Sequence, residues 1–132
     1  MADKLQFDLV SPERAIASLQ VDLVEAPGVE GEFGVMADHA PFMTVLAPGV
    51  VKYTDGGSQT RIFVRGGFAE VTPAGLTILA EEAIPVAEFD RDDIARRIKN
   101  CEEDLADADT LPETRLHAQA ELQHLKEIQA AL

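Results

Sequence analysis

The chain contains one cysteine, no tryptophan and no long hydrophobic run in its 132 residues. A single cysteine cannot form an internal disulfide bond, and residues 1–7 lack the basic start and apolar stretch of a signal peptide, so we expect a cytoplasmic protein. A membrane-spanning helix needs roughly 20 consecutive apolar residues, and no segment comes near that length. We therefore expect no direct membrane insertion, and any association with a membrane should run through another protein.

Positive charge is also scarce, because 11 lysines and arginines face 24 aspartates and glutamates and the net charge is −13. Nucleic acids and anionic lipid surfaces would repel such a chain, and the sequence offers neither a basic stripe nor an aromatic stacking platform. Hydrophobic residues make up 46% of the chain, which is enough for a folded core. The composition argues against nucleic acid as a partner and favours another protein.

Alternation of apolar and polar residues predicts strands in the first two thirds of the chain. Turn sequences rich in proline and glycine interrupt the alternation at short intervals, and Asp55-Gly56 suits a two-residue type I′ hairpin turn. Many short strands at regular spacing predict an antiparallel sandwich or flattened barrel. The alternating runs are Leu5–Leu9, Leu19–Leu23, Ile62–Val64 and Leu76–Ala80.

The hydrophobic period becomes helical after Asp90, a residue suited to cap the N-terminus of a helix. Thr110 and Glu113 form a capping-box pattern that starts a second helix, and the short connection between the two helices predicts an antiparallel hairpin. The apolar face of the first helix is Ile94, Ile98, Cys101, Leu105 and Ala108, and that of the second is Ala118, Leu122, Leu125, Ile128 and Leu132.

Residues 28–42 read GVEGEFGVMADHAPF, residues 66–71 read GGFAEV and residues 76–83 read LTILAEEA. Together these segments resemble the epsilon subunit of bacterial F-type ATP synthases, the counterpart of the mitochondrial delta subunit. The resemblance implies a mixed β plus α fold, with an antiparallel β-sandwich of about ten strands in residues 1–86 and a two-helix hairpin in residues 87–132. It also implies a non-catalytic rotor subunit that couples the gamma shaft to the membrane rotor ring of a proton-translocating ATP synthase. Such a subunit would be peripheral, on the cytoplasmic side of the bacterial inner membrane.

The glycine-rich loop of residues 28–34 has three glycines at a spacing of three, with carboxylates between them and no lysine nearby. A phosphate-binding loop requires the pattern G-x-x-x-x-G-K-[ST], so we interpret this loop as a docking surface rather than a nucleotide site. The resemblance implies that it meets polar loops of the rotor ring, where its carboxylates would face basic or amide groups. The residues assigned to this ring interface are Gly28, Glu30, Gly31, Glu32 and Gly34.

His39 follows Asp38, and a neighbouring carboxylate can orient an imidazole for catalysis. No serine or cysteine nucleophile accompanies it in a recognisable motif, so a small sandwich enzyme built around His39 is the weaker hypothesis. The resemblance instead implies a gamma-subunit interface made by His39, Ala40, Pro41, Phe42 and Met43. Many family members place a proline two residues before this histidine, where this chain has Ala37, so the shape of the loop is expected to differ.

Glu121 and His124, with His117 before them, match half of a carboxylate-bridged di-iron motif. Such sites take ligands from four helices and this chain predicts two, so we expect no metal and interpret these residues as helix surface.

Asp93 and Arg96 are a candidate nucleotide site, because some epsilon subunits bind ATP through an I/L-D-x-x-R-A motif at this place. Asp92 and Arg97 depart from that motif, and an ion pair on the helix surface is the alternative interpretation, so we expect weak or absent ATP binding. A nucleotide-sensing module that closes its hairpin on ATP is the rival function.

The resemblance also implies that the last helix of inhibitory members extends into the catalytic alpha/beta hexamer and meets acidic segments there. Between residues 113 and 132 this chain carries three glutamates against one arginine and one lysine. Like charges disfavour that insertion, so we expect only weak inhibition of ATP hydrolysis.

Overall fold

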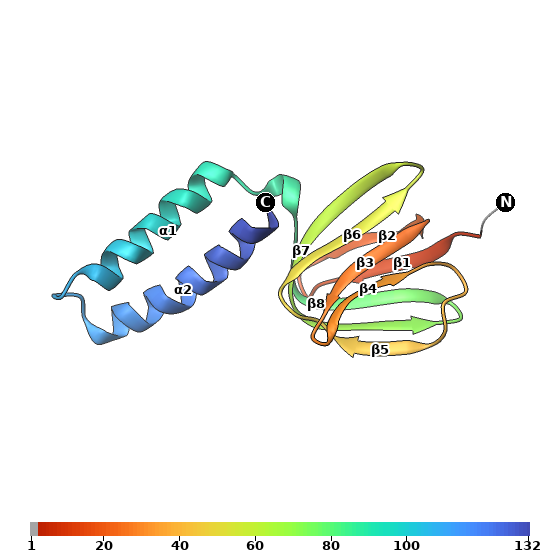
Figure 1. Ribbon diagram of the computed structural model, residues 1–132, viewed down its shortest axis with the longest axis horizontal. Coiled ribbons are helices and arrows are strands. Elements are labelled where there is room, and N and C mark those ends of the chain that lie inside the picture. The colour runs from red at the N-terminus through yellow and green to blue at the C-terminus, as the bar shows by residue number, and fades with distance from the viewer. Residues whose placement is uncertain (1–2) are drawn as a thin grey trace. The chain divides into compact units, whose positions relative to one another are not determined.

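The structure is a computed structural model that describes residues 3–132, in which eight strands are followed by a short 3-10 helix and two α-helices (Figure 1). The elements are β1 (Leu5–Val10), β2 (Ala15–Val21), β3 (Leu23–Gly28), β4 (Gly31–Val35), β5 (Phe42–Val45), β6 (Gly49–Asp55), β7 (Ser58–Thr72), β8 (Gly75–Pro85), the 3-10 helix η1 (Val86–Glu88), α1 (Arg91–Ala106) and α2 (Pro112–Ala131).

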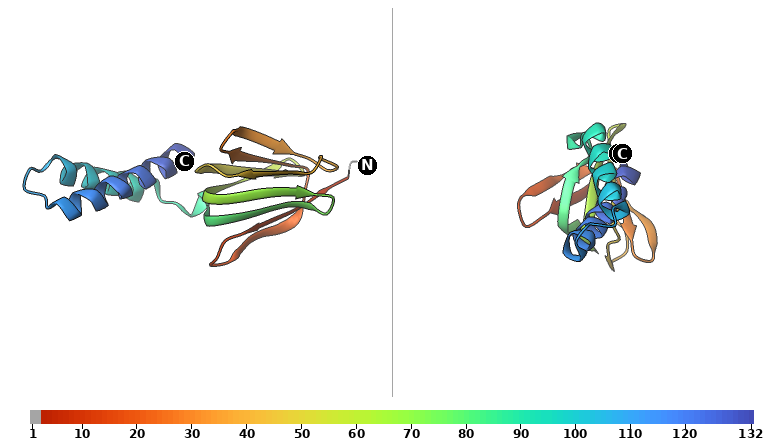
Figure 2. Two further views of the ribbon diagram at one scale, coloured as in Figure 1. Left: turned by 90° about the horizontal axis from the view of Figure 1, so that it is seen from below. Right: turned by 90° about the vertical axis from the view of Figure 1, so that its left-hand side faces the viewer.

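The strands form one hydrogen-bonded sheet in the order β2-β1-β8-β7-β6-β3-β4, with β5 paired to β7. Phe7 of β1 contacts Tyr53 of β6 with ring centroids 5.5 Å apart, although β8 and β7 separate these two strands in the sheet. The sheet must therefore curl so that its two halves face each other, which Figure 2 shows. Side chains from both halves, including Leu9, Val24 and Ile78, are fully buried between the layers.

Two long strands carry the chain from one layer to the other. The first half of β7 pairs with β6, and its second half, from Phe68 to Val71, pairs with β5. The change of direction lies at Gly66 and Gly67, whose φ angles of 71° and 107° are accessible to glycine. A Cβ atom on Gly67 would lie 2.0 Å from the carbonyl oxygen of Leu79, so this corner requires glycine.

The sandwich followed by two helices is confirmed, with two corrections to the expected strand pattern. The structure has eight strands within residues 3–132 rather than about ten, because β7 and β8 extend over 15 and 11 residues and each contributes to more than one pairing. One strand pair is also parallel, since β1 runs alongside the start of β8 in the same direction.

Helix α1 is capped as its sequence predicts, because the Asp90 carboxylate accepts hydrogen bonds from the backbone N–H groups of Asp92 and Asp93 at 2.9 and 3.2 Å. The predicted capping box of α2 is wrong. The N-cap position is taken by Leu111, which makes no side-chain cap, and the proline that follows it is the first helical residue. The residues buried on the helices are Ile94, Ile98, Cys101, Ala118, Leu125, Ile128 and Ala131.

Contacts along the chain define two compact units, divided between Ala87 and Glu88. The first unit contains the sandwich and the second contains α1 and α2. Within the described residues, neither helix has the length and hydropathy that crossing a membrane would demand.

Candidate functional site

The glycine-rich loop forms the hairpin between β3 and β4, with Gly28 opposite Gly31 across a turn made by Val29 and Glu30. Gly31 has a φ of 132°, and a Cβ atom on Gly28 would lie 2.8 Å from the Gly31 carbonyl oxygen. The tight turn therefore depends on glycine at both positions. It leaves the side chains of Glu30 and Glu32 exposed, as a docking loop requires.

The segment that contains His39 joins β4 to β5 and begins with a turn in which the His39 N–H donates to the Met36 carbonyl at 3.3 Å. Asp38 occupies the left-handed region with a φ of 64°, the one such non-glycine residue in the described chain. The imidazole Nδ1 of His39 lies 2.7 Å from the Ala40 carbonyl oxygen, so its contact is with the backbone of the next residue rather than with Asp38. This arrangement offers no oriented base beside a nucleophile.

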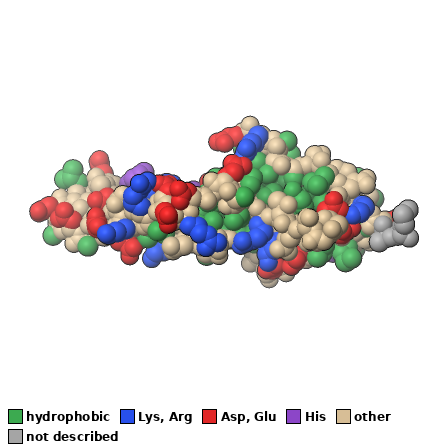
Figure 3. All heavy atoms as spheres, turned by 90° about the horizontal axis from the view of Figure 1, so that it is seen from above, with side chains coloured by type: hydrophobic (Ala, Val, Ile, Leu, Met, Phe, Trp, Pro, Cys, Tyr) green, Lys and Arg blue, Asp and Glu red, His purple; other side chains and the backbone are tan. Residues whose placement is uncertain are grey.

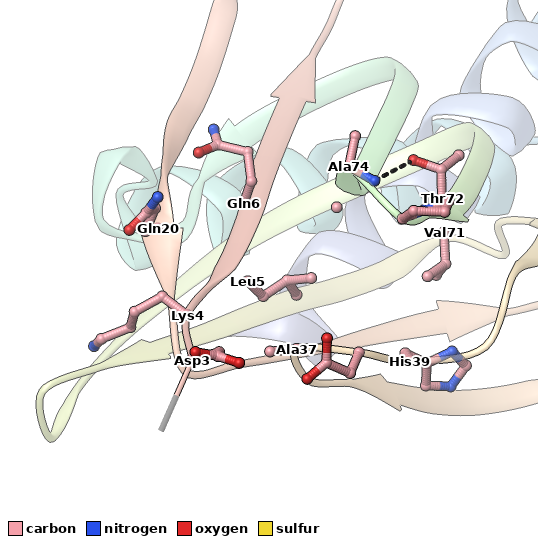
Figure 4. A pocket seen from close by; sticks show the side chains of 13 residues that line it. Asp3, Lys4, Leu5, Gln6, Gln20, Ala37, His39, Val71, Thr72 and Ala74 are labelled. Atoms are coloured by element: carbon pink, nitrogen blue, oxygen red, sulfur yellow. Dashed lines mark hydrogen bonds between the residues drawn. The ribbon is translucent and has the colours of Figure 1, made fainter. Parts of the chain in front are cut away.

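A hollow of about 690 Å³ lies beside His39 at this end of the sandwich (Figure 4). Gln6 and Gln20, on the neighbouring strands β1 and β2, form part of its wall, and the turn before β8 forms another part, where the Thr72 hydroxyl accepts the Ala74 N–H at 3.2 Å. Lys4, also in the lining, is held by Asp22 and Asp55 at 2.7 and 2.5 Å. Across residues 3–132 no group of three or more histidine, cysteine, aspartate or glutamate side chains is placed to hold a metal ion.

An exposed apolar row crosses four strands of the sandwich. Strand pairing sets Val10 beside Leu79, Leu79 beside Phe68, and Phe68 beside Val45. These side chains are 36, 41, 40 and 56% exposed, and Met43, two residues before Val45, is 61% exposed. A contiguous apolar row of this kind marks an interaction surface. Figure 3, which views the molecule from above, shows hydrophobic side chains over part of the sandwich and many charged side chains on the helices.

The apolar row consists of four residues that the sequence interpretation did not assign to an interface: Val10, Val45, Phe68 and Leu79. The sequence does contain a sign of an exposed apolar surface. In Leu9-Val10 and in Ile78-Leu79 two consecutive strand residues are apolar, although consecutive side chains point to opposite faces of a sheet. Leu9 and Ile78 are fully buried, so their neighbours must point outward.

The predicted gamma-interface residues divide according to strand geometry. His39, Pro41 and Met43 are exposed, and Met43 extends the apolar row along β5. Phe42 points to the opposite side of the strand, where its ring packs edge-on against Phe33 at 5.4 Å. Phe42 is still 39% exposed, so it contributes surface at the rim of the sandwich.

Asp93 and Arg96 lie one turn apart on α1 and form an exposed ion pair with each other. The next residue, Arg97, reaches across to α2, where its Nη2 lies 3.0 Å from Glu121 Oε1.

Cys101 is 5% exposed, and burial raises the pKa of its thiol. The structure places no sequence-predicted site residue in a catalytic arrangement, and the exposed surfaces are suited to binding.

Comparison with known proteins shows similarity along nearly the whole chain. Residues 4–86 match the family described as ATP synthase, Delta/Epsilon chain, beta-sandwich domain. The ATP synthase epsilon chain of Parvibaculum lavamentivorans is 53% identical over 129 residues, which cover 97% of each chain. That of Hyphomonas neptunium is 47% identical over 133 residues, covering 100% of this chain and 98% of the relative.

Two solved structures share the fold. A chain of the Euglena gracilis mitochondrial ATP synthase, in a structure of OSCP, F1 and the c-ring, aligns with a TM-score of 0.78 and 25% identity over 96% of this chain and 80% of its own. A chain of the Tetrahymena thermophila mitochondrial ATP synthase central stalk and c-ring aligns with a TM-score of 0.59 and 15% identity, over 98% of this chain and 96% of its own.

Proposed function

The chain belongs to the family of ATP synthase epsilon chains, and from that premise we propose that it is a rotor subunit coupling the gamma shaft to the membrane rotor ring. As an epsilon chain it is a non-catalytic subunit of an enzyme complex. We expect it at the cytoplasmic side of a bacterial inner membrane, bound there through its protein partners. The observation that carries the proposal is the apolar row of Val10, Val45, Phe68 and Leu79, which a free subunit would leave in water.

The apolar row is the surface that we assign to the gamma subunit, together with the segment from His39 to Met43. Large apolar side chains contribute about 1.5–3 kcal/mol each when fully buried, and those of the row still have between a third and three fifths of their surface to bury. Four such residues in adjacent register offer the compact apolar centre that protein interfaces use.

The hairpin between β3 and β4 is the surface that we assign to the rotor ring. Its turn is narrow because Gly28 and Gly31 allow close backbone packing, and Glu30 and Glu32 present two carboxylates to a partner. Exposed carboxylates at an interface rim guide recognition more than they add affinity, and they select a partner with basic or amide groups.

The test is the double substitution Glu30→Lys and Glu32→Lys in the assembled synthase, followed by ATP-driven proton pumping in reconstituted membranes. We expect pumping to fall while the melting temperature of the free subunit stays the same, because exposed loop charges contribute little to stability. The matched control is Glu102→Lys with Glu103→Lys, which makes the same change in charge on the exposed surface of α1. Equal pumping by both double variants would remove the hairpin from the ring interface.

The rival function, a nucleotide-sensing module, draws on the spacing of Asp93 and Arg96. In the structure these two residues form an ion pair with each other, so a phosphate group would have to displace the Asp93 carboxylate from Arg96. The neighbouring Asp92 carboxylate would also repel that phosphate. We therefore propose that ATP binds weakly or not at all. Calorimetric titration of the free subunit with MgATP measures this directly, and tight binding would favour the rival.

A further inference from the structure

Arg115 of α2 is bound to the end of α1. Its side chain reaches back across the connection between the helices, where Nη1 donates to the Leu105 carbonyl at 2.6 Å and Nη2 donates to the Asp107 carbonyl at 2.8 Å. Two hydrogen bonds donated by one planar guanidinium fix both the orientation of the arginine side chain and its distance from the carbonyls, which a single hydrogen bond does not. One side chain therefore attaches the last turn of α1 to the first turn of α2.

The end of α1 needs such a partner, because the final carbonyls of a helix have no donor within the helix. The Asp109 N–H, which would serve Leu105 in a continuing helix, donates instead to the Asp107 carboxylate at 2.9 Å. The last turn of α1 has no basic residue of its own to balance the negative end of the helix dipole. Arg115 provides that positive charge from the other helix.

The local charge makes this arginine more important. Six acidic residues and no lysine or arginine occur between residues 102 and 113, so repulsion acts within the turn of the hairpin. Arg115 is the first base after them, and it is half-buried against the turn. The acidic residues are Glu102, Glu103, Asp104, Asp107, Asp109 and Glu113.

We propose that Arg115 is a clasp that keeps α1 and α2 folded against each other, so that its removal shifts the hairpin toward an open form. Another polar link between the helices joins Arg97 to Glu121, whose side chains are 47 and 34% exposed, so water screens this ion pair. Any consequence of the clasp for ATP hydrolysis depends on the proposed function. The clasp itself is a property of the free chain.

Cys101 provides the assay. It is the only thiol in the chain, and it is 5% exposed on the buried face of α1, together with Ile94 and Ile98. Opening of the hairpin exposes this thiol to an aromatic disulfide reagent such as DTNB. Burial and the Glu121 charge raise the pKa of the Cys101 thiol, and opening would remove both, so greater access and greater acidity of the thiol change the rate in the same direction and a faster reaction at fixed pH reports opening.

With the full-length chain, Arg115→Ala should raise the DTNB rate of Cys101 on the order of tenfold, as expected for losing hydrogen bonds from a charged donor. Arg115→Lys keeps the charge but loses the paired geometry, so its rate should be intermediate. The control is Lys126→Ala, which removes an exposed positive charge from the same helix and should leave the rate unchanged.

Circular dichroism distinguishes opening from melting. A faster Arg115→Ala rate with full helical signal supports the clasp. Equal rates for Arg115→Ala and Lys126→Ala overturn it, and so does a loss of helical signal in both Arg115 variants, because the arginine would then be required for the helices themselves. The assay uses the free chain, so its result is independent of whether the subunit contacts the rotor ring.

Discussion

Phe68 of β7 lies directly opposite Leu79 of β8, and the two side chains are 40 and 41% exposed. Paired strands bring such side chains within contact of each other, so they shield one another partly but leave a joint apolar surface. Val10 and Val45 extend this surface on either side. A partner that covers the row buries all four side chains together, which is the physical basis of the gamma interface proposed above.

The substitution Leu79→Glu should weaken binding of the free subunit to the gamma subunit by about tenfold or more. It removes an apolar contact at the centre of the row and places a charge where the partner would exclude water. The fold should survive because the position faces outward. Surface plasmon resonance measures the affinity, and Gln59→Glu is the control, since it adds the same charge at an exposed position of β7 outside the row. Matching affinities would exclude the row from the interface.

The inward face of the sandwich could be predicted from the sequence, and its curvature could not. The alternation of apolar and polar residues identified Phe7, Leu9 and Ile78 as core positions, and all three are fully buried. A strand with one buried face has an apolar residue at every second position. The corner at Gly66 and Gly67 depends on contacts with residues far along the chain, so a short window around it predicts only a break in a strand.

The sequence likewise indicated the local turns of the candidate binding surfaces but not the surfaces assembled from several strands. The glycine hairpin was recognisable because tight turns have strong local requirements. The apolar row was not, since it is assembled from four strands whose pairing the local sequence does not specify. The clasp was also missed, because nothing in the spacing of Arg115 indicates that its side chain turns back to Leu105.

Asp38 adopts a φ of 64°, which costs free energy for a residue with a Cβ atom and little for glycine. We expect Asp38→Gly to leave the free energy of unfolding unchanged or slightly raised, and Asp38→Val to lower it by roughly 1–2 kcal/mol, since a β-branched side chain tolerates this region poorly. Urea denaturation of both variants provides the measurement. Equal stability of the two variants would show that the loop changes conformation freely, so that the positive φ is not imposed by the fold.

Lys4 joins two loops at one end of the sandwich through Asp22 and Asp55. Hydrogen bonds from Lys4 and from the Gly56 N–H lower the pKa of Asp22 below its ordinary value of 3.8. A lowered pKa in the folded state means that this stabilisation is fully present above pH 3.8 and is lost as the pH falls through the folded value.

The urea midpoint of Asp22→Asn should therefore fall less than that of the parent between pH 5 and pH 3. The control is Glu102→Gln on the exposed surface of α1, which should follow the parent. A parallel decline in Asp22→Asn and the parent would mean that the Lys4 contact contributes nothing in solution.

Truncation after Ala87 should leave a folded sandwich. The hydrophobic cluster of the sandwich is made entirely by residues between Leu5 and Ala83, and the contacts of the chain divide after Ala87. A unit with its own core is expected to fold alone. Two-dimensional NMR of the truncated protein should show dispersed amide shifts, and a spectrum confined to random-coil shifts would refute a separable domain of residues 1–86.

Deleting residues 110–132 should raise the ATP hydrolysis of the assembled synthase only slightly. Of the two bases on α2, Arg115 is directed to the carbonyls of α1, which leaves Lys126 as the exposed one. If the catalytic hexamer presents acidic segments to this helix, as the family resemblance implies, then Glu113 and Glu127 oppose its insertion.

The same argument predicts the opposite effect for a charge reversal. Glu113→Lys reverses a charge at an exposed position of α2 without touching the Arg97–Glu121 link, so this variant should inhibit hydrolysis more strongly than the parent. Steady-state hydrolysis by the purified synthase, compared across parent, deletion and reversal, separates charge from shape. Large activation by the deletion, together with no added inhibition by the reversal, would show that apolar contact and shape control insertion of α2, because charge would then have failed to predict either change.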